Sequence, residues 1–146
     1  MSIADIVEMN NYPWEGKAGA SEEAVTALKL SAGGTLPKPY LDFLQVSNGG
    51  EGELPVLPFY AVLWSAEEVI ENNQGYEVAT YAPGFFGIGS SGGGEMLAFD
   101  LALEDSSALF ALPFMGMDRE EAILVASDFE QFVSILGRKE HSEDSG

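Results

Sequence analysis

The side chains in this sequence that could do chemistry are almost all carboxylates. The chain has 24 Asp and Glu residues, one histidine and no cysteine. Two carboxylates can act as acid and base in glycoside hydrolysis when their separation and their pKa values are right. Glu95 and Asp100 form one such candidate pair. Because chance pairs are plentiful among so many acids, we interpret this pair as solvated surface, and a carboxylate-based hydrolase stays an alternative.

The composition excludes most other catalytic and metal-binding chemistry. Without cysteine there is no disulfide, no thiolate metal site and no cysteine nucleophile. The single histidine, His141, lies in a polar tail, so a Ser-His-Asp triad would require that tail to fold back. The cluster Glu67, Glu68 and Glu71 lacks the spacing of a calcium-binding EF-hand loop. The sequence therefore predicts no catalytic residue, no cofactor and no metal site.

The glycine-rich segment 89–94 could in principle hold an anion, because successive backbone N–H groups can cradle a phosphate. It lacks the Gly-Lys-Ser/Thr ending of a phosphate-binding loop, and the segment after it has the pattern of a strand. Glu95 and Asp100 would also repel a phosphate. The segment therefore predicts a turn rather than a nucleotide site.

The charge of the chain is strongly unbalanced. Six Lys and Arg residues against 24 acids give a formal net charge of -18, spread along the sequence. Nucleic acids and anionic membrane surfaces attract clustered Lys and Arg, which this chain lacks, so neither is an expected partner. A cationic protein would be attracted over a distance. The alternative is that the acidity serves only to keep the protein soluble.

One turn combines glycines with acids and is our candidate for partner binding. Glycine first ends a helix, because it accepts a positive φ, but it also lets a partner approach the backbone closely. Trp14 lies among polar residues and is expected to be exposed, whereas Trp64 ends an apolar run and is expected to pack inside. The candidate partner-binding residues are Asn48, Gly49, Gly50, Glu51, Glu53, Glu67 and Glu95.

Four segments have the apolar spacing and the capping residues of helices. Asn48 and the two glycines after it close the second of them. Ser65 and Ser127 each begin a capping box, with Glu68 and Glu130 three residues further on. The predicted helices cover residues 21–31, 35–47, 65–73 and 127–136.

Apolar runs bounded by turn residues predict the strands. The prolines at positions 55 and 58 allow only edge or irregular strand before residue 59. The turn at 89–94 joins two runs into a hairpin. The predicted strands cover residues 59–64, 85–88, 96–101, 108–112 and 122–126.

This order of elements predicts an α+β fold with a central, mostly antiparallel β-sheet. Two N-terminal helices, one short middle helix and a C-terminal helix should pack on the sheet. We expect one domain over residues 1–138, its first twenty residues least certain, and a disordered acidic tail over 139–146. Acids at the N-terminus stand where a secretory signal has Lys or Arg, which predicts a cytoplasmic protein. No apolar run is long enough to span a membrane.

Three segments, in this order, resemble the SUKH superfamily. Leu36-Pro-Lys-Pro-Tyr-Leu-Asp-Phe-Leu-Gln-Val-Ser-Asn-Gly-Gly50 is similar to the family's helix that ends in an Asn-Gly turn. Residues 86–100 are similar to its central hairpin, with Ser91 where an acid or amide is commoner. Residues 125–132 resemble its closing strand-to-helix junction, and Val133 stands where leucine often follows. Together the resemblance covers about residues 21–136.

The resemblance implies protein binding rather than catalysis. The superfamily includes bacterial toxin-immunity proteins and fungal cell-wall-assembly regulators linked to killer-toxin resistance. The expected function is thus an immunity-type protein that neutralises a basic toxin domain through an acidic surface. A regulatory scaffold that binds several cellular proteins is the alternative. The sequence leaves the identity of the partner and the oligomeric state open.

Overall fold

The computed structural model describes residues 2–103 and 107–138, so the predicted tail and His141 lie outside the described residues. Its strands form one sheet in which spatial order follows chain order and every neighbouring pair is antiparallel. This arrangement confirms the predicted α+β class with a central antiparallel sheet. The strands are β1 (Trp14–Gly16), β2 (Gly50–Glu53), β3 (Tyr60–Leu63), β4 (Phe85–Ser90), β5 (Glu95–Asp100), β6 (Leu109–Pro113) and β7 (Ile123–Ala126).

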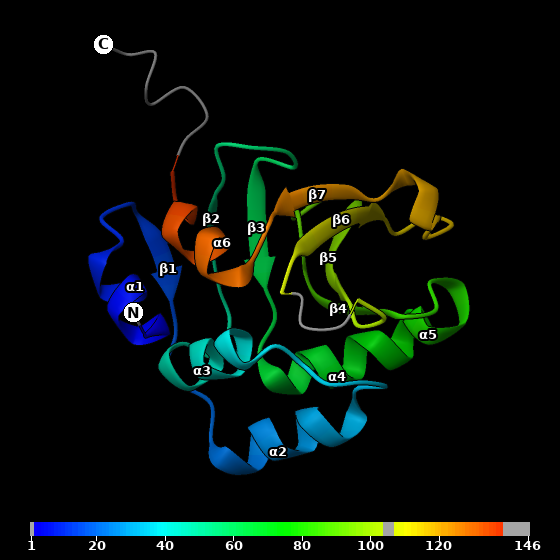
Figure 1. Ribbon diagram of the computed structural model, residues 1–146, viewed down its shortest axis with the longest axis horizontal. Helices are drawn as coiled ribbons and strands as arrows, with labels where there is room; N and C mark the ends of the chain where they lie inside the picture. The colour runs from blue at the N-terminus through cyan, green and yellow to red at the C-terminus, as the bar shows by residue number, and fades with distance from the viewer. Residues whose placement is uncertain (1, 104–106, 139–146) are drawn as a thin grey trace.

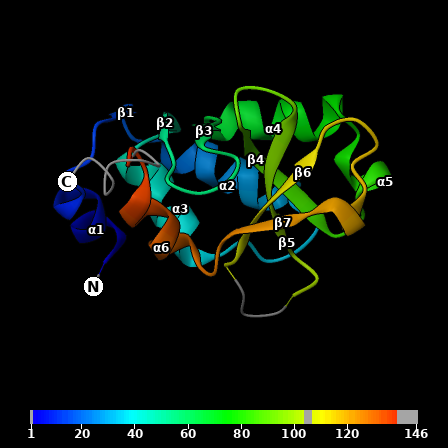
Figure 2. The ribbon, with the colours of Figure 1, turned by 90° about the horizontal axis from the view of Figure 1, so that it is seen from above.

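The sheet curls, and helices cover it from two sides (Figures 1 and 2). α4 packs on β4 with α2 outside it, while α3 and α6 lie between the β1–β3 part and the β5–β7 part of the sheet. No helix in the described part of the chain combines the length and apolar composition needed to cross a bilayer. The helices are α1 (Ile3–Met9), α2 (Glu22–Ser31), α3 (Lys38–Val46), α4 (Ala66–Gly75), α5 (Val78–Tyr81), α6 (Phe129–Ile135) and the 3-10 helix η1 (Arg119–Glu121).

The predicted helix starts are confirmed for α2 and α4 and corrected for α3 and α6. α3 begins at Lys38, three residues after its predicted start. In α4, the Ser65 hydroxyl accepts a hydrogen bond from the Glu68 N–H, and the Glu68 carboxylate accepts one from the Ser65 N–H. At α6 the capping box of Ser127 with Glu130 is wrong. Asp128 is the N-cap, and it accepts a hydrogen bond from the N–H of Gln131 at 2.8 Å. The Asp128 carboxylate, one residue after Ser127, caps the helix instead, and α6 begins at Phe129.

The helix α1 and the strands β1 and β2 were not predicted, nor were the short helices α5 and η1. α1 carries a capping box of its own, formed by Ser2 and Asp5, a signal present in the sequence. β1 has only three residues and β2 reads Gly-Glu-Gly-Glu, which lacks the β-branched and aromatic residues of strands. Both strands exist because β3 pairs with β2 and β2 with β1.

Trp14 was expected to be exposed, and this is wrong because β2 offers its indole a surface of glycines. A Cβ built on Gly50 would lie 2.9 Å from the indole, and one on Gly52 would lie 2.7 Å from the Trp14 Cβ. The indole therefore lies directly on the backbone of β2 and is half-buried, 5.9 Å from the ring of Phe43. Trp64, 9% exposed, packs inside as predicted.

The core between α3, α6 and the sheet is built from aromatic rings. The ring of Phe129 on α6 lies 5.5 Å from both Tyr40 and Phe43 of α3 and 5.8 Å from Phe99 of β5. All three pairs meet edge to face, the arrangement that aromatic quadrupoles favour. Burial raises the pKa of the Tyr40 phenol, whose hydroxyl has no hydrogen-bond partner among the described residues. Phe129 thus joins the helical layer to the sheet.

One amide side chain ties α4 to the sheet. Asn73 donates hydrogen bonds to the carbonyl oxygens of Val69 and Gly87, each at 2.8 Å, and accepts one from the Gly87 N–H at 2.9 Å. The register of β4 against β5 shifts between Gly87 and Gly89. Gly87 keeps Ala98 as its partner in β5, but the pairing of β4 with β3 ends at Gly89, opposite Leu63. Asn73 binds the backbone of Gly87 from the helix, where β3 provides no paired residue.

Candidate protein-binding site

Three acids and a tyrosine share the outer face of β1, β2 and β3, which we call the acidic strand face. Glu15 lies directly opposite Glu51, and Glu53 lies directly opposite Tyr60. Directly paired residues, and residues two apart on one strand, point to the same face of a sheet. The acidic strand face therefore consists of Glu15, Glu51, Glu53 and Tyr60.

The sequence of β2 explains why these acids point outward. Its residues alternate between buried glycine and half-exposed glutamate. The Trp14 side chain packs directly against Gly50 and Gly52 on the inner face. It leaves no room there for a Cβ, so only glycine fits at these two positions. Strand alternation then sends Glu51 and Glu53 to the opposite, solvated face.

The acidic strand face borders a shallow depression of about 400 Å³. Within it the hydroxyl of Tyr60 donates a hydrogen bond to the carboxylate of Glu51 at 2.6 Å. This hydrogen bond, followed by burial and by repulsion from Glu51, Glu15 and Glu53, raises the pKa of Tyr60 to about 12. The hydrogen bond to Glu51, with smaller contributions from burial and the nearby carboxylates, thus keeps the Tyr60 phenol protonated to a higher pH.

Glu51→Gln should lower the pKa of Tyr60 toward its ordinary value of 10.0. The amide can still accept the hydrogen bond, but the nearest negative charge is gone. Because the pKa of Tyr60 is raised in the folded protein, its contribution to stability is full below pH 10 and is lost as the pH rises to about 12. Phenolate absorbance, measured as the difference from Tyr60→Phe, gives the pKa. Glu8→Gln is the control, and an equal change there would contradict the assignment.

An apolar loop projects between β2 and β3, beside the acidic strand face (Figure 1). Its side chains Val56, Leu57 and Phe59 are all exposed, Leu57 at 55%. The loop is held in shape by hydrogen bonds from the Phe59 N–H to the Val56 carbonyl at 2.7 Å and from the Leu54 N–H to the Phe59 carbonyl at 2.9 Å. Exposed apolar side chains next to fixed charge are typical of protein interfaces, where the apolar part is covered and the charged part lies at the rim.

The other predicted partner-binding residues have structural partners. Asn48 accepts a hydrogen bond from the Ala66 N–H and donates one to Glu67 at 3.0 Å, so these two lie together at the start of α4. The Asn48 amide is the main cause that lowers the pKa of Glu67. Gly49 and Gly50 both have positive φ, and a Cβ at either would meet backbone oxygen. Their first role is to carry the chain from α3 into β2.

Glu95 lies away from the acidic strand face. Glu51, Val62, Ser90 and Met96 form a row across four strands, and Glu95 precedes Met96. Three strand spacings separate the ends of that row by about 14 Å, and alternation turns Glu95 to the other face. Its carboxylate accepts a hydrogen bond from the Ser91 hydroxyl at 2.7 Å.

Glu95 and Asp100 do not form an acid–base pair. They occupy the two ends of β5, on opposite faces and about 17 Å apart by strand rise, whereas paired glycosidase carboxylates lie within about 10 Å. Asp100 is buried and bound to Arg119 at 2.6 Å, so it serves the fold and was not solvated surface as expected. Within residues 2–103 and 107–138 no three acidic or histidine side chains converge as metal ligands.

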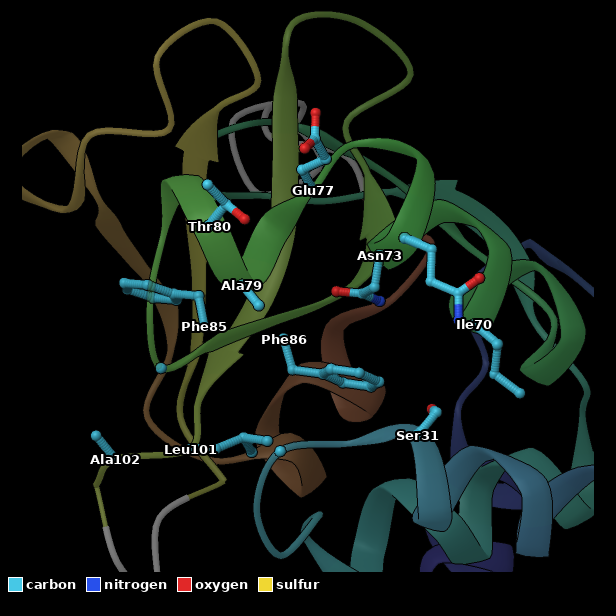
Figure 3. A pocket seen from close by; sticks show the side chains of 13 residues that line it. Ser31, Ile70, Asn73, Glu77, Ala79, Thr80, Phe85, Phe86, Leu101 and Ala102 are labelled. Carbon is cyan, nitrogen blue, oxygen red and sulfur yellow. The ribbon is translucent and has the colours of Figure 1, made fainter.

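A larger cavity of about 630 Å³ lies between the end of α2, α4, α5 and the start of β4 (Figure 3). Phe86 and Leu101 line its base, and Asn73 lies beside Phe86. All three hydrogen bonds described for Asn73 go to the backbone of α4 and β4. Most of the cavity surface is apolar, and its lining also includes the polar side chains Ser31, Gln74, Glu77 and Thr80.

Sequence reasoning missed Glu15 and Tyr60 as members of the site. Tyr60 lies two residues before Val62 in a predicted strand, so the two side chains point to the same face of the sheet. Once the inner face is known, this spacing places Tyr60 on the outer face. Glu15 carried no such signal, because nothing local predicts a three-residue strand.

The fold defines the class of protein: an α+β domain built on a curled antiparallel meander with an acidic outer strand face. The chain belongs to the SMI1 / KNR4 family (SUKH-1), whose family model matches residues 19–135. This match confirms the resemblance noted in the sequence. It includes β2, β3 and the apolar loop but begins after Glu15. A comparison with curated proteins gives no significant match.

Proposed function

We propose that this protein is a non-catalytic, intracellular binding module of the immunity type, and that its partner is a cationic protein, with basic toxin domains the favoured class. The observation that carries the proposal is the acidic strand face with the apolar loop next to it. Membership of the SMI1 / KNR4 family supports an immunity or a regulatory role. The net charge of -18 supports a cationic partner.

The two parts of this surface have different tasks in binding. Long-range attraction between the carboxylates and a basic partner speeds the encounter and weakens as salt is added. Burial of Leu57 and its apolar neighbours sets how long the complex lasts, because affinity is tuned mostly through the dissociation rate. Tyr60 contributes an aromatic side chain of the kind enriched in interface hot spots.

The test is capture of partners from the native organism's lysate at low salt, followed by binding kinetics with the main captured protein. We expect one basic protein, released at a defined salt step. Replacing Glu15, Glu51 and Glu53 together by Gln should slow association about tenfold or more. Leu57→Ser should leave association unchanged and shorten the lifetime of the complex.

The matched control replaces the exposed Glu8, Glu22 and Glu71 by Gln, which changes the net charge equally. Equal slowing in both triple variants would assign the effect to net charge and contradict a specific face. Weak capture of several proteins, independent of salt, would favour the regulatory scaffold instead.

A further inference from the structure

The open edge of β7 is a second surface that neither the family match nor the acidic strand face explains. β7 ends the sheet and pairs only with β6. In Figure 1 it runs along the upper border of the sheet, and no described helix or strand lies along its outer side. An edge strand presents unpaired backbone N–H and C=O groups that can pair with another chain.

The two edges of this sheet differ in how they are protected. β1, at the other end, has three residues, follows Pro13 and carries the charge of Glu15. Proline, charge and shortness are the usual devices that prevent pairing at an edge. β7 reads Ile-Leu-Val-Ala, with neither charge nor proline. Ile123 and Leu124 are 38% and 57% exposed, so apolar side chains are open on both faces of the strand.

The apolar surface continues from the edge onto β6. Leu124 lies directly opposite Phe110, which is half-buried and meets the ring of Phe85 edge to face at 6.0 Å. A strand that paired with β7 could therefore place side chains against Leu124 and its neighbours as well as form backbone hydrogen bonds.

Carboxylates stand at both ends of the edge. Glu120 and Glu121 of η1 precede β7, and Asp128 follows it; all three are exposed. The cation at the first end, Arg119, is already bound to Asp100 and to the Pro83 carbonyl. A strand of four residues spans about 13 Å. The complementary ligand is a short extended segment, apolar in the middle and cationic at its ends.

The same charges oppose a second copy of this chain. Antiparallel pairing of two β7 strands would place Glu120 and Glu121 of one copy next to Asp128 of the other. Each copy also carries a formal net charge of -18. Like charges opposed across a strand pair are destabilising.

We propose that the edge of β7 binds one extended segment of a protein partner by strand addition, through an apolar centre and Lys or Arg at both ends. This surface lies at the opposite end of the sheet from the acidic strand face, so binding at β7 can be tested independently of the proposed function. Strand addition takes its affinity from backbone hydrogen bonds and its specificity from alternate side chains.

The experiment is an NMR titration of the full chain with a capped synthetic peptide, Lys-Lys-Val-Thr-Val-Thr-Lys-Lys. We expect amide shifts centred on β7 and slower hydrogen exchange of its outward N–H groups. Leu124→Lys should weaken binding about tenfold, because it adds a charge to the edge. Leu30→Lys on α2 makes the same charge change at a side chain that is 82% exposed and should leave the affinity unchanged.

Two altered peptides separate strand addition from simple attraction. The peptide with N-methylated valines cannot form all backbone hydrogen bonds, and the peptide with Glu in place of Lys reverses the charge; both should lose binding. Undiminished binding of the methylated peptide, shifts centred on Glu51 and Glu53, or no binding at all would overturn the proposal. Concentration-dependent dimerisation abolished by Leu124→Lys would also overturn it, because the edge would then serve a second copy.

Discussion

Phe129→Ala should lower the free energy of unfolding by about 4 kcal/mol, the cost of removing a large aromatic side chain from a packed core. The Phe129 side chain is fully buried and contacts rings from α3, β5 and its own helix. The cavity would open where the helical layer meets the sheet, so neither layer could close it alone. Domains of this size are stable by only about 5–15 kcal/mol, so the variant should lose a large share of its stability.

Urea unfolding followed by circular dichroism measures this loss. Tyr81→Ala is the matched control, because it also removes an aromatic ring but from an exposed position on α5. We expect a change within about 0.5 kcal/mol for the control. A loss for Phe129→Ala no larger than that of the control would contradict the assignment of Phe129 as the link between the layers.

Asn73→Ala should cost about 3 kcal/mol, although it removes no apolar packing. The side chain is a hydrogen-bond partner of both the N–H and the C=O of Gly87, which is buried at the bulge of β4. Each buried polar group left without a partner costs about 1–3 kcal/mol. Alanine cannot replace either bond, and β3 has no residue paired with Gly87 that could supply them.

Hydrogen exchange tests this prediction at a single amide. The Gly87 amide should exchange faster in Asn73→Ala than the overall loss of stability requires, because its own acceptor has been removed. Asn72→Ala changes the preceding asparagine and should leave that amide protected. If the Gly87 amide in Asn73→Ala kept the same protection relative to global unfolding, the hydrogen bond to Asn73 would not be what protects that amide from exchange.

The sequence predicted α2, α3, α4, α6 and the second half of the sheet because those elements carry local signals. Ser21 and Ser65 cap helices where expected, and the apolar runs around the 89–94 turn form β4 and β5. The elements α1, β1 and β2 were missed for different reasons. The Ser2 capping box of α1 was present but not used, whereas β1 forms only by pairing with β2, more than thirty residues away, and β2 only between β1 and β3. Local propensity does not contain that information.

The candidate site was predicted in part for the same reason. Glu51 and Glu53 were identified from the charge that follows a glycine turn, and the structure places both on one face. Asn48 and Glu67 proved to bind each other, and Glu95 lies on another strand and face. Glu15 enters the site only through pairing of β1 with β2. Which acids gather on one face depends on the register of strands, which no single segment specifies.

The direct opposition of Glu15 and Glu51 carries a thermodynamic penalty for the free protein. Their mutual repulsion destabilises the β1–β2 pairing, and the same two charges would attract a cationic partner. Added salt screens both effects, so it should stabilise the β1–β2 pairing and weaken the binding of a cationic partner. In the unbound protein this repulsion would lower the local stability of the β1–β2 pair, and a cationic partner would relieve it. Lower local stability would then accompany stronger recognition.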